Sequence, residues 1–330
     1  MWDDKGLVLP RNVMANWNIR ISEYYLESLW NLMLKDIKSS NELIHCDETT
    51  MQCNKENGRK ASTNSYMWVL RSGELEKKKG VIFKYSPSRS EETAKTFLGN
   101  YKGILVTDGY ACYKNIEGIT HAECWAHMRR YFYESIPLLE NKQMDTNATG
   151  YTAVLYCDKL FKIEREIALL SVEEKQKERQ NKSKPILEEF FKWVDKISEY
   201  AIVNKKLKKA LTYAKNQQKE LKEFLNDGRI PLTNSLAERA IRPFAVHRKN
   251  WLFADTVAGA NANAVYYSLI ESAKINKLNI SKYINYLLEK LPQIEILTDE
   301  ELEKYLPWSN ELPNEIKNYE EEYTELNFEE

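Results

Sequence analysis

Three acidic residues that lie far apart in the sequence each stand where a strand or a helix is expected. They are Asp47 in "HCDETTMQ", Asp108 in "GILVTDGY" and Glu238 in "NSLAERAIRPF". Carboxylate oxygens are the ligands that Mg²⁺ prefers. Two such ions, about 3.5–4 Å apart, can stabilise the attacking and leaving oxygens of a phosphodiester displacement. If the fold brings the three acids together, they could therefore hold metal ions for phosphodiester cleavage.

Each acid also has a purely structural interpretation. Ser235-x-x-Glu238 matches a capping box at a helix start, a motif that contributes on the order of 1 kcal/mol and needs no metal. Asp108 before Gly109 suits a turn, and Asp47 could be a surface acid at the end of a strand. Spacing alone does not decide between these interpretations and the catalytic one.

Basic residues follow Glu238 closely. Arg239, Arg242, Arg248 and Lys249 lie within eleven residues of it, and such side chains could neutralise DNA phosphates, the main source of non-specific DNA affinity. Trp251 comes next and could stack on an unpaired base. The alternative is that "NWLF" is a core strand or helix.

A second group of candidate residues follows Asp108. Cys124-x-x-His127, with His121 nearby, resembles part of a zinc site. Zinc sites usually need four ligands, and no second pair has suitable spacing, so a role in supporting the active site is favoured. Arg129 and Arg130, one turn later, could reach phosphates.

The elements that would position these residues follow from periodicity. Apolar side chains at four-residue steps predict a helix over residues 21–37. Strand and helix patterns then predict three strands at 42–52, 66–73 and 81–88, a helix at 90–101, a fourth strand at 102–110, a fifth at 119–125 and a helix at 126–136. Three strands, a helix and another strand is the order of a ribonuclease H-like fold. We therefore expect an α/β protein with a mixed five-stranded sheet and flanking helices.

The remainder is predicted to be helical. The expected organisation is a helical lead-in (1–40), the first part of the catalytic domain (41–144), a large helical insertion (145–228), a catalytic helix with the third acid (229–260), a helical C-terminal segment (261–309) and an acidic tail (310–330). The charge-rich run "SVEEKQKERQNKSK" in the insertion is interpreted as a solvated face.

Composition limits the class of protein. Residues 310–330 contain eight Glu and one Lys, whereas the whole chain has a net charge of −1, so the remaining body is mildly basic and suits an anionic partner. Five cysteines without a CxxC pair predict a reducing, cytoplasmic setting. No apolar run approaches the length of a membrane span.

Five motifs in this order resemble the transposase of the insertion sequence 66 family of bacterial mobile elements. They are "HCDETTMQ", "YSPSRSEETAKTFL", "GILVTDGYACYKN", "CWAHMRRYF" and "NSLAERAIRPFAVHRKNWLFA". The resemblance runs from about Leu9 to Trp308 and implies a DDE transposase with a ribonuclease H-like core. On the family pattern, Asp47, Asp108 and Glu238 are the catalytic, metal-binding acids.

The resemblance also implies cofactors and partners. These are two Mg²⁺ ions, for which Mn²⁺ would substitute, and DNA in the form of the transposon's terminal inverted repeats and the target. Accessory proteins of the element and a homo-oligomer on DNA are further expected partners. The sequence departs from the family in having Thr233-Asn234-Ser235 where Asp-Asn-Asn is common. It also begins near the end of the family's N-terminal DNA-binding region, so we expect this chain to lack that region.

Overall fold

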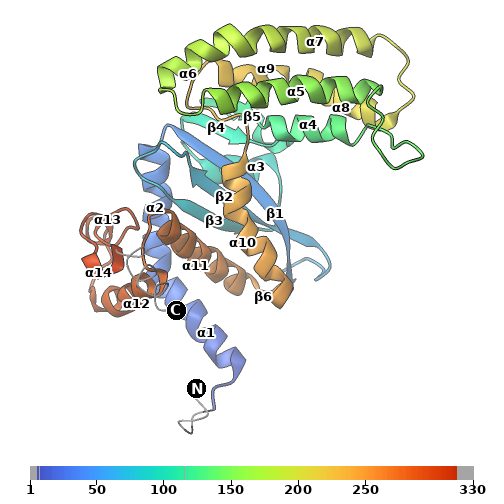
Figure 1. Cartoon of the computed structure of the whole chain (residues 1–330). Coiled ribbons are helices and arrows are strands. Elements are labelled where there is room, and N and C mark those ends of the chain that lie inside the picture. Colours follow the sequence, from blue (N-terminus) through green and yellow to red (C-terminus); the bar gives the residue numbers. More distant parts are fainter. Residues whose placement is uncertain (1–5, 7, 115, 318–330) are drawn as a thin grey trace, which may run out of the picture. The chain divides into compact units, whose positions relative to one another are not determined.

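The computed structural model describes residue 6, residues 8–114 and residues 116–317. The chain divides into two compact units (Figure 1). Unit 1 comprises Met1–Tyr101 and Ala237–Glu330, and unit 2 comprises Lys102–Leu236. Most of the acidic tail predicted at 310–330 lies outside the described residues.

Unit 1 is built on four strands. β1 (Leu43–Lys55) pairs antiparallel with β2 (Asn64–Ser72), which pairs antiparallel with β3 (Val81–Ser86). β6 (Phe253–Thr256) lies parallel to β1. The β1–β2 register is continuous from Ile44 opposite Ser72 to Gln52 opposite Asn64, so side chains alternate regularly between the two faces of β1. β6 is a strand beyond the five that the sequence predicted.

The N-terminal helix of unit 1 is longer than the sequence indicated. α1 (Arg11–Ile21), a π-helical turn η2 (Ser22–Leu26) and α2 (Glu27–Ser40) run on without a break. The predicted apolar face is confirmed in α2, where Leu29, Met33 and Ile37 are fully buried. α1 buries no residue, which explains why periodicity did not reveal it.

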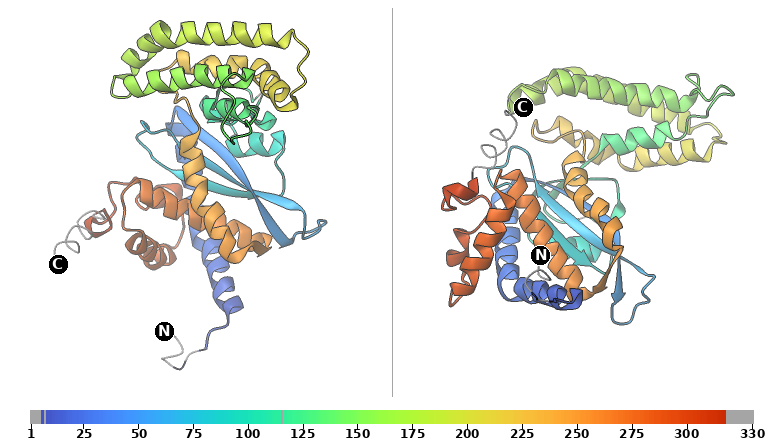
Figure 2. Two further views of the ribbon diagram at one scale, coloured as in Figure 1. Left: turned by 45° about the vertical axis from the view of Figure 1, so that its right-hand side comes forward. Right: turned by 60° about the horizontal axis from the view of Figure 1, so that its bottom comes forward.

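Two helices pack on one face of the unit 1 sheet. α10 (Ser235–Trp251) contributes Ala237, Ala240, Ile241 and Phe244 to a core cluster that also contains side chains of β1, β2 and β3. α11 (Val257–Ile275) adds Ala260 and Ala264 to it. The ribbon views show both helices along the same side of these strands (Figure 2). We call this side of the sheet the α10 face.

The remaining helices complete unit 1. α3 (Glu91–Leu98) begins at Ser90, whose hydroxyl accepts a hydrogen bond from the Thr93 amide, and Phe97 in this helix contacts Trp68 of β2. The C-terminal segment contains α12 (Ile280–Lys290), the 3-10 turn η6 (Leu291–Gln293), α13 (Asp299–Glu303) and α14 (Asn314–Lys317).

Unit 2 combines two parallel strands with a helical layer. β4 (Gly103–Thr107) pairs with β5 (Ile119–Glu123), and η3 (Ala111–Tyr113) lies between them in the chain. The helices are α4 (Trp125–Tyr133), α5 (Thr149–Glu166), α6 (Val172–Glu178), the π-helical turn η4 (Arg179–Ser183), α7 (Lys184–Ser198), α8 (Lys205–Asn216), α9 (Gln218–Lys222) and the 3-10 turn η5 (Glu223–Leu225). Trp125 lies at their centre, in contact with Phe190, Phe191 and Phe224.

The charge-rich run in the insertion is not uniformly solvated, which corrects the prediction for one of its charged residues. Arg179 is only 2% exposed, and its guanidinium donates to both carboxylate oxygens of Glu164 and to the carbonyl oxygens of Phe224 and Asp227. A single buried Arg among many exposed Lys and Glu side chains leaves no mark on the periodicity of the run.

The element order confirms the predicted fold class. Three antiparallel strands, a helix, a strand, a further parallel strand and a helix follow one another as β1-β2-β3-α3-β4-β5-α4, and the helical insertion comes between α4 and α10. The chain is a mixed α/β protein with a ribonuclease H-like fold. None of its described helices combines the length and apolar character needed to cross a membrane.

Candidate active site

Asp47 lies in the middle of β1, on the α10 face of the sheet. It shares this face with Met51 and Cys53, both members of the core cluster, and its cross-strand partner Val69 is another member. The side chain is half-buried, and Oδ1 accepts a hydrogen bond from the Glu48 amide (2.8 Å). Because β1 continues to Lys55, the interpretation of Asp47 as an acid at a strand end is wrong.

Glu48, the next acid, has a different role. Its side chain points to the opposite face of β1, is only 1% exposed and forms an ion pair with Arg89. A buried carboxylate needs such a partner. β1 therefore directs two adjacent acids to opposite faces of the sheet. Glu48 pairs with Arg89 on one face, and Asp47 lies on the α10 face.

Asp108 directly follows β4 in unit 2 and is half-buried. Its Oδ1 accepts a hydrogen bond from the Tyr110 amide (3.0 Å), as an Asp at a turn commonly does. The predicted turn is therefore present. Oδ2 has no hydrogen-bond partner among the described residues, so the turn leaves one carboxylate oxygen available to a ligand.

Glu123 is an acid near Asp108 that sequence reasoning missed. It ends β5, opposite Thr107 in the β4–β5 register, and is 3% exposed. Burial, together with Glu220 nearby, raises the pKa of Glu123 to about 8, and the Asp108 carboxylate adds to the shift. Tyr213 on α8 donates a hydrogen bond to its Oε2 (3.3 Å). Its partners come from a polar helical stretch with no motif, so the sequence carried no signal for this contact.

Glu238 lies in the first turn of α10, and its side chain is exposed. Ala237, immediately before it, is fully buried in the cluster on the α10 face, the face that also carries Asp47. Unit 1 thus places two of the three predicted acids on one side of its sheet. The helix begins at Ser235 itself, so the residue that precedes it is the buried Asn234.

The basic residues of α10 lie mainly on its solvent side. Arg239, Arg242 and Lys249 are exposed, and Arg248 is half-buried and donates to Thr50 Oγ1 on β1 (3.3 Å). The buried stripe of α10 packs on the sheet, which leaves these cations facing solvent in unit 1. A helix that buries alanines and exposes arginines is well suited to an anionic surface.

Trp251 has the core contacts that sequence reasoning gave as its alternative. Its ring packs against the core residue Phe244 in an edge-to-face contact (5.4 Å between centroids). One side of it also lines a cavity of about 800 Å³, in which α1, β6 and α11 supply the other walls.

The other predicted residues lie around β5 and α4 in unit 2. Cys124 is fully buried at the start of α4, and its amide donates to the Thr107 carbonyl beside Asp108 (3.1 Å). His127 is half-buried one turn later. Arg129 is held by Asp158 on α5 (2.7 Å), so a phosphate would have to compete with that carboxylate, whereas Arg130 is exposed.

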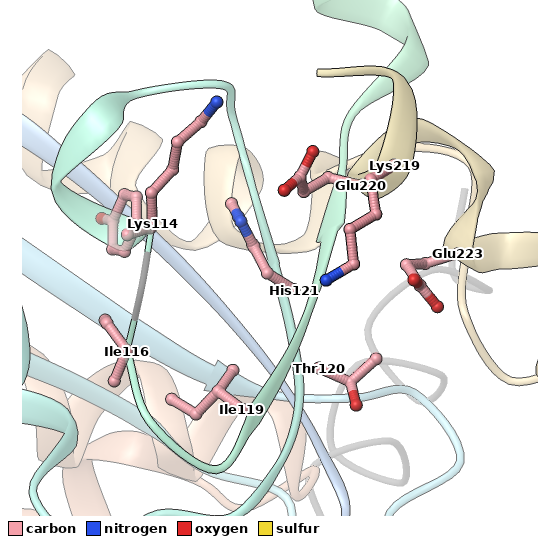
Figure 3. Close-up of a pocket in the computed structure, with 9 residues that line it drawn as sticks. Lys114, Ile116, Ile119, Thr120, His121, Lys219, Glu220 and Glu223 are labelled. Atoms are coloured by element: carbon pink, nitrogen blue, oxygen red, sulfur yellow. The ribbon is translucent and has the colours of Figure 1, made fainter. Parts of the chain in front are cut away.

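His121 lines a pocket of about 350 Å³ (Figure 3). Its Nε2 is 2.7 Å from Thr107 Oγ1, and burial lowers the pKa of His121 to about 4, with the Lys114 ammonium adding to the effect. The pocket carries charges of both signs, from Lys114, Lys219, Glu220 and Glu223. This mixture does not favour an anion or a cation.

Each of the three predicted acids has donor atoms that suit a divalent cation. Asp47, Asp108 and Glu238 are oxygen donors and are half-buried or exposed rather than enclosed, and Asp108 keeps Oδ2 without a protein partner among the described residues. Mg²⁺ retains several waters and is usually bound through one or two carboxylates, which such accessible acids allow. Asp47 and Glu238 belong to unit 1, and Asp108 belongs to unit 2.

Comparison with known proteins gives relatives of similar sequence. Three proteins of Sinorhizobium fredii (strain NBRC 101917 / NGR234), each described as uncharacterized, are similar to the chain. They are y4qI (27% identical over 92% of this chain and 57% of the relative), y4jD (29%, 92% and 60%) and y4hP (30%, 81% and 50%). The chain thus spans between half and three fifths of the length of these relatives.

A solved structure and two family models also match. The structure, described as the Drosophila P element transposase strand transfer complex, is 13% identical, with 86% of this chain and 75% of that chain covered, and its TM-score of 0.27 is too low to add to the fold assignment. The model for the transposase IS66 family matches residues 1–262, and that for the IS66 C-terminal element matches residues 268–308. Because these matches cover nearly the whole chain, this protein belongs to the IS66 family of transposases.

Proposed function

We propose that the protein is a DDE transposase that cleaves the ends of a bacterial insertion sequence and joins them to target DNA in a Mg²⁺-dependent reaction. One observation carries the proposal: in a chain of this family, acids occupy the middle of β1, the end of β4 and the first turn of α10. Asp47 and Glu238 are both associated with the α10 face of unit 1, and Asp108 keeps an open carboxylate oxygen.

The chemistry consists of two displacements at phosphorus. In the first, a water oxygen attacks the phosphate at the transposon's 3′ end, the bond from phosphorus to the 3′ oxygen breaks, and the strand leaves with a free 3′-hydroxyl. In the second, that hydroxyl attacks a phosphate of the target, and the target's own 3′ oxygen leaves. Each attacking oxygen loses a proton and each leaving oxygen gains one, so neither step needs an oxidant or a reductant.

Different residues of the chain would bind the metal ions, contact the DNA and support the site. Asp47, Asp108 and Glu238 would hold two Mg²⁺ ions, which supply charge stabilisation for the attacking and leaving oxygens. The exposed cations of α10, Arg239, Arg242 and Lys249, with Arg248 beside them, would neutralise phosphates near the cut. Trp251, Arg129 and Arg130 remain secondary DNA contacts, and Cys124 and His127 would support the end of β4 beside Asp108.

The partners are inferred from the same reaction. Terminal inverted repeats of the element and target DNA are the substrates of a transposase. Several copies of the chain, or accessory proteins of the element, would bring two ends together. The basic body of the chain is compatible with both DNA partners.

A cleavage assay tests the proposal. The substrate is a duplex that carries the terminal repeat flanking the gene, incubated with Mg²⁺, with Mn²⁺ or with EDTA. Wild type should nick this duplex only with a metal ion, and Asp108→Asn should be slower by about 100-fold or more, as expected when a group that stabilises transition-state charge is lost. Asp255→Asn is the matched control, because Asp255 is an acid in a surface ion pair with Lys55.

The outcomes separate the proposal from two alternatives. If wild type nicks no faster than Asp108→Asn, the chain is a non-catalytic remnant that binds DNA or a partner transposase, and the proposal fails. If wild type nicks but yields no joined product from a pre-cut end and a target plasmid, it is a nuclease of the same fold. Joined product that requires Asp108 supports the transposase.

A further inference from the structure

The turn that carries Asp108 is held by the helical insertion of unit 2. Asp108 and Gly109 follow β4, more than a hundred residues before the end of α8. In the folded unit, side chains from the end of α8 and from the α8–α9 junction lie directly on this turn. Three independent contacts make the connection.

The first contact is a hydrogen bond from Gln217. This residue stands between α8 and α9 and is 5% exposed. Its Nε2 donates to the Gly109 carbonyl oxygen (3.1 Å). This partly buried bond from a side chain to a backbone carbonyl restrains the orientation of the peptide that directly follows Asp108.

The second contact is steric. A Cβ added to Gly109 would lie 2.0 Å from Tyr213 Oη and 2.4 Å from Cε2, distances that no real carbon occupies. The phenol ring of Tyr213 therefore rests on the Gly109 backbone, and only glycine leaves room for it. The ring is itself fixed, because it packs on Tyr131 (4.7 Å between centroids) and its hydroxyl donates to Glu123.

The third contact lies further along the same loop. Lys114 Nζ donates to the Asn216 carbonyl oxygen at the end of α8 (3.2 Å), and the Lys114 side chain is drawn beside His121 in Figure 3. The loop between β4 and β5 thus contacts the end of α8 and the α8–α9 junction at two points, Gly109 and Lys114.

We propose that Tyr213 and Gln217 are positioning residues of the active site: they clamp the Asp108–Gly109 turn, so the helical insertion sets the geometry of the second acid. This inference rests on the proposed function for its catalytic consequence, but the clamp itself is a property of unit 2. Displacement of a reacting group by about 1 Å can lower a rate by about 10²-fold. Mutation of a residue that orients a metal ligand typically lowers metal affinity by about 10–100-fold.

A matched pair of variants tests the clamp. Gln217→Ala removes the bond to Gly109. Gln180→Ala removes a similar bond in the same insertion, from Gln180 Nε2 to the Leu225 carbonyl (2.9 Å), which does not involve the turn. Amide hydrogen exchange over residues 105–113 should become faster in Gln217→Ala and stay at the wild-type rate in Gln180→Ala.

The metal dependence gives a second readout that does not require turnover. Mn²⁺ binding, followed by electron paramagnetic resonance, should weaken by about 10-fold in Gln217→Ala and remain unchanged in Gln180→Ala. In cleavage assays, the Mg²⁺ concentration for half-maximal rate should rise correspondingly, while affinity for the DNA duplex and the melting temperature change little. A merely structural role would lower the melting temperature without shifting the metal dependence.

The steric contact is tested by compensation. Gly109→Ala should speed exchange of the turn and weaken Mn²⁺ binding, because the methyl group displaces Tyr213. In a Tyr213→Leu background, whose side chain lacks the clashing atoms, Gly109→Ala should add little further damage. Equal effects of Gly109→Ala in both backgrounds would overturn the steric part of the clamp.

Failure of the clamp is distinguishable from failure of the proposed function. If wild type shows no metal-dependent cleavage, the function fails, and the exchange rates still decide whether Gln217 holds the turn. If wild type cleaves DNA but Gln217→Ala leaves exchange, Mn²⁺ binding and Mg²⁺ dependence unchanged, the clamp is wrong.

Discussion

Arg179 offers the largest stability effect that can be worked out from the structure. Arg179→Met keeps the length of the side chain but removes the guanidinium from a site that is 2% exposed. It eliminates two bonds to Glu164 (2.8 and 2.7 Å) and two bonds to the carbonyls of Phe224 and Asp227 (2.9 and 3.0 Å). Both carbonyls belong to the segment that follows α9, so the change loosens the attachment of α9 to η4.

The expected loss in the free energy of unfolding depends on the polar groups that Arg179→Met leaves without a partner. Removal of one partner from a buried ion pair typically costs about 3–5 kcal/mol. Glu164 is 18% exposed and can regain some water, which favours the lower half of that range, whereas each orphaned carbonyl adds about 1 kcal/mol or more. We therefore expect a loss of about 5–6 kcal/mol. At about 2–4 °C per kcal/mol for a unit of this size class, the melting temperature of unit 2 should fall by about 10–24 °C.

Urea unfolding followed by circular dichroism and tryptophan fluorescence measures this loss. Lys182→Met is the matched control, because Lys182 lies on the same π-helical turn and pairs with Glu178 at the surface, with the two side chains 49% and 29% exposed. Such a pair contributes about 0–1 kcal/mol. The double variant Arg179→Met/Glu164→Leu should recover part of the loss, since no unpaired charge remains. A cost for Arg179→Met no larger than that of Lys182→Met would refute the reasoning.

Three further predictions concern the site and its surroundings. Glu238→Gln should lower end cleavage by about 100-fold or more with an unchanged unfolding curve, because the exposed side chain of Glu238 packs no core; cleavage at the wild-type rate would remove Glu238 from the acids. His121→Gln should remove a pH dependence of the free energy of unfolding. The pKa of His121 in the folded protein is about 4, below its ordinary value of 6.5. The free energy of unfolding of wild type is therefore highest above pH 6.5 and should fall by about 3 kcal/mol relative to the variant as the pH is lowered to 4. Urea unfolding at both pH values checks this, and a constant difference contradicts it. Arg242→Ala should weaken binding to any duplex and make the slope of log affinity against log salt concentration shallower by about 0.9; an unchanged slope in a salt titration means that this exposed cation contacts no phosphate.

Much of the fold could be predicted from local patterns. The strands predicted at 42–52, 66–73 and 81–88 correspond to β1, β2 and β3, because runs rich in Val, Ile, Tyr and Trp between Gly, Ser and Pro are typical of strands. α1 and β6 were not recognised as such. α1 buries no residue, and β6 has only four residues whose place is fixed by pairing with the distant β1. Patterns of burial cannot show elements that bury little or that depend on a remote partner.

The candidate site could likewise be predicted only in part from the sequence. The order of motifs identified the family and pointed to Asp47, Asp108 and Glu238, but it did not show how the environment of Asp47 differs from that of the neighbouring Glu48. The continuous β1–β2 register directs Glu48 to Arg89 and Asp47 to the α10 face. The sequence also did not fix where α10 starts, which in the structure is at Ser235 itself. Boundaries of this kind depend on how the chain enters the helix rather than on residue type.

The sequence by itself determined the family, the order of strands and helices, and the three acids on which a transposase reaction would depend. It did so because periodicity and ordered motifs are local properties of the chain. Only the tertiary structure decided which polar side chains of the insertion are buried and what they hold. Tyr213 and Gln217 reach Gly109 from about a hundred residues away, and Arg179 is enclosed while Lys182 is solvated. Contacts between distant segments depend on how helices pack, and nothing in the neighbouring residues records them.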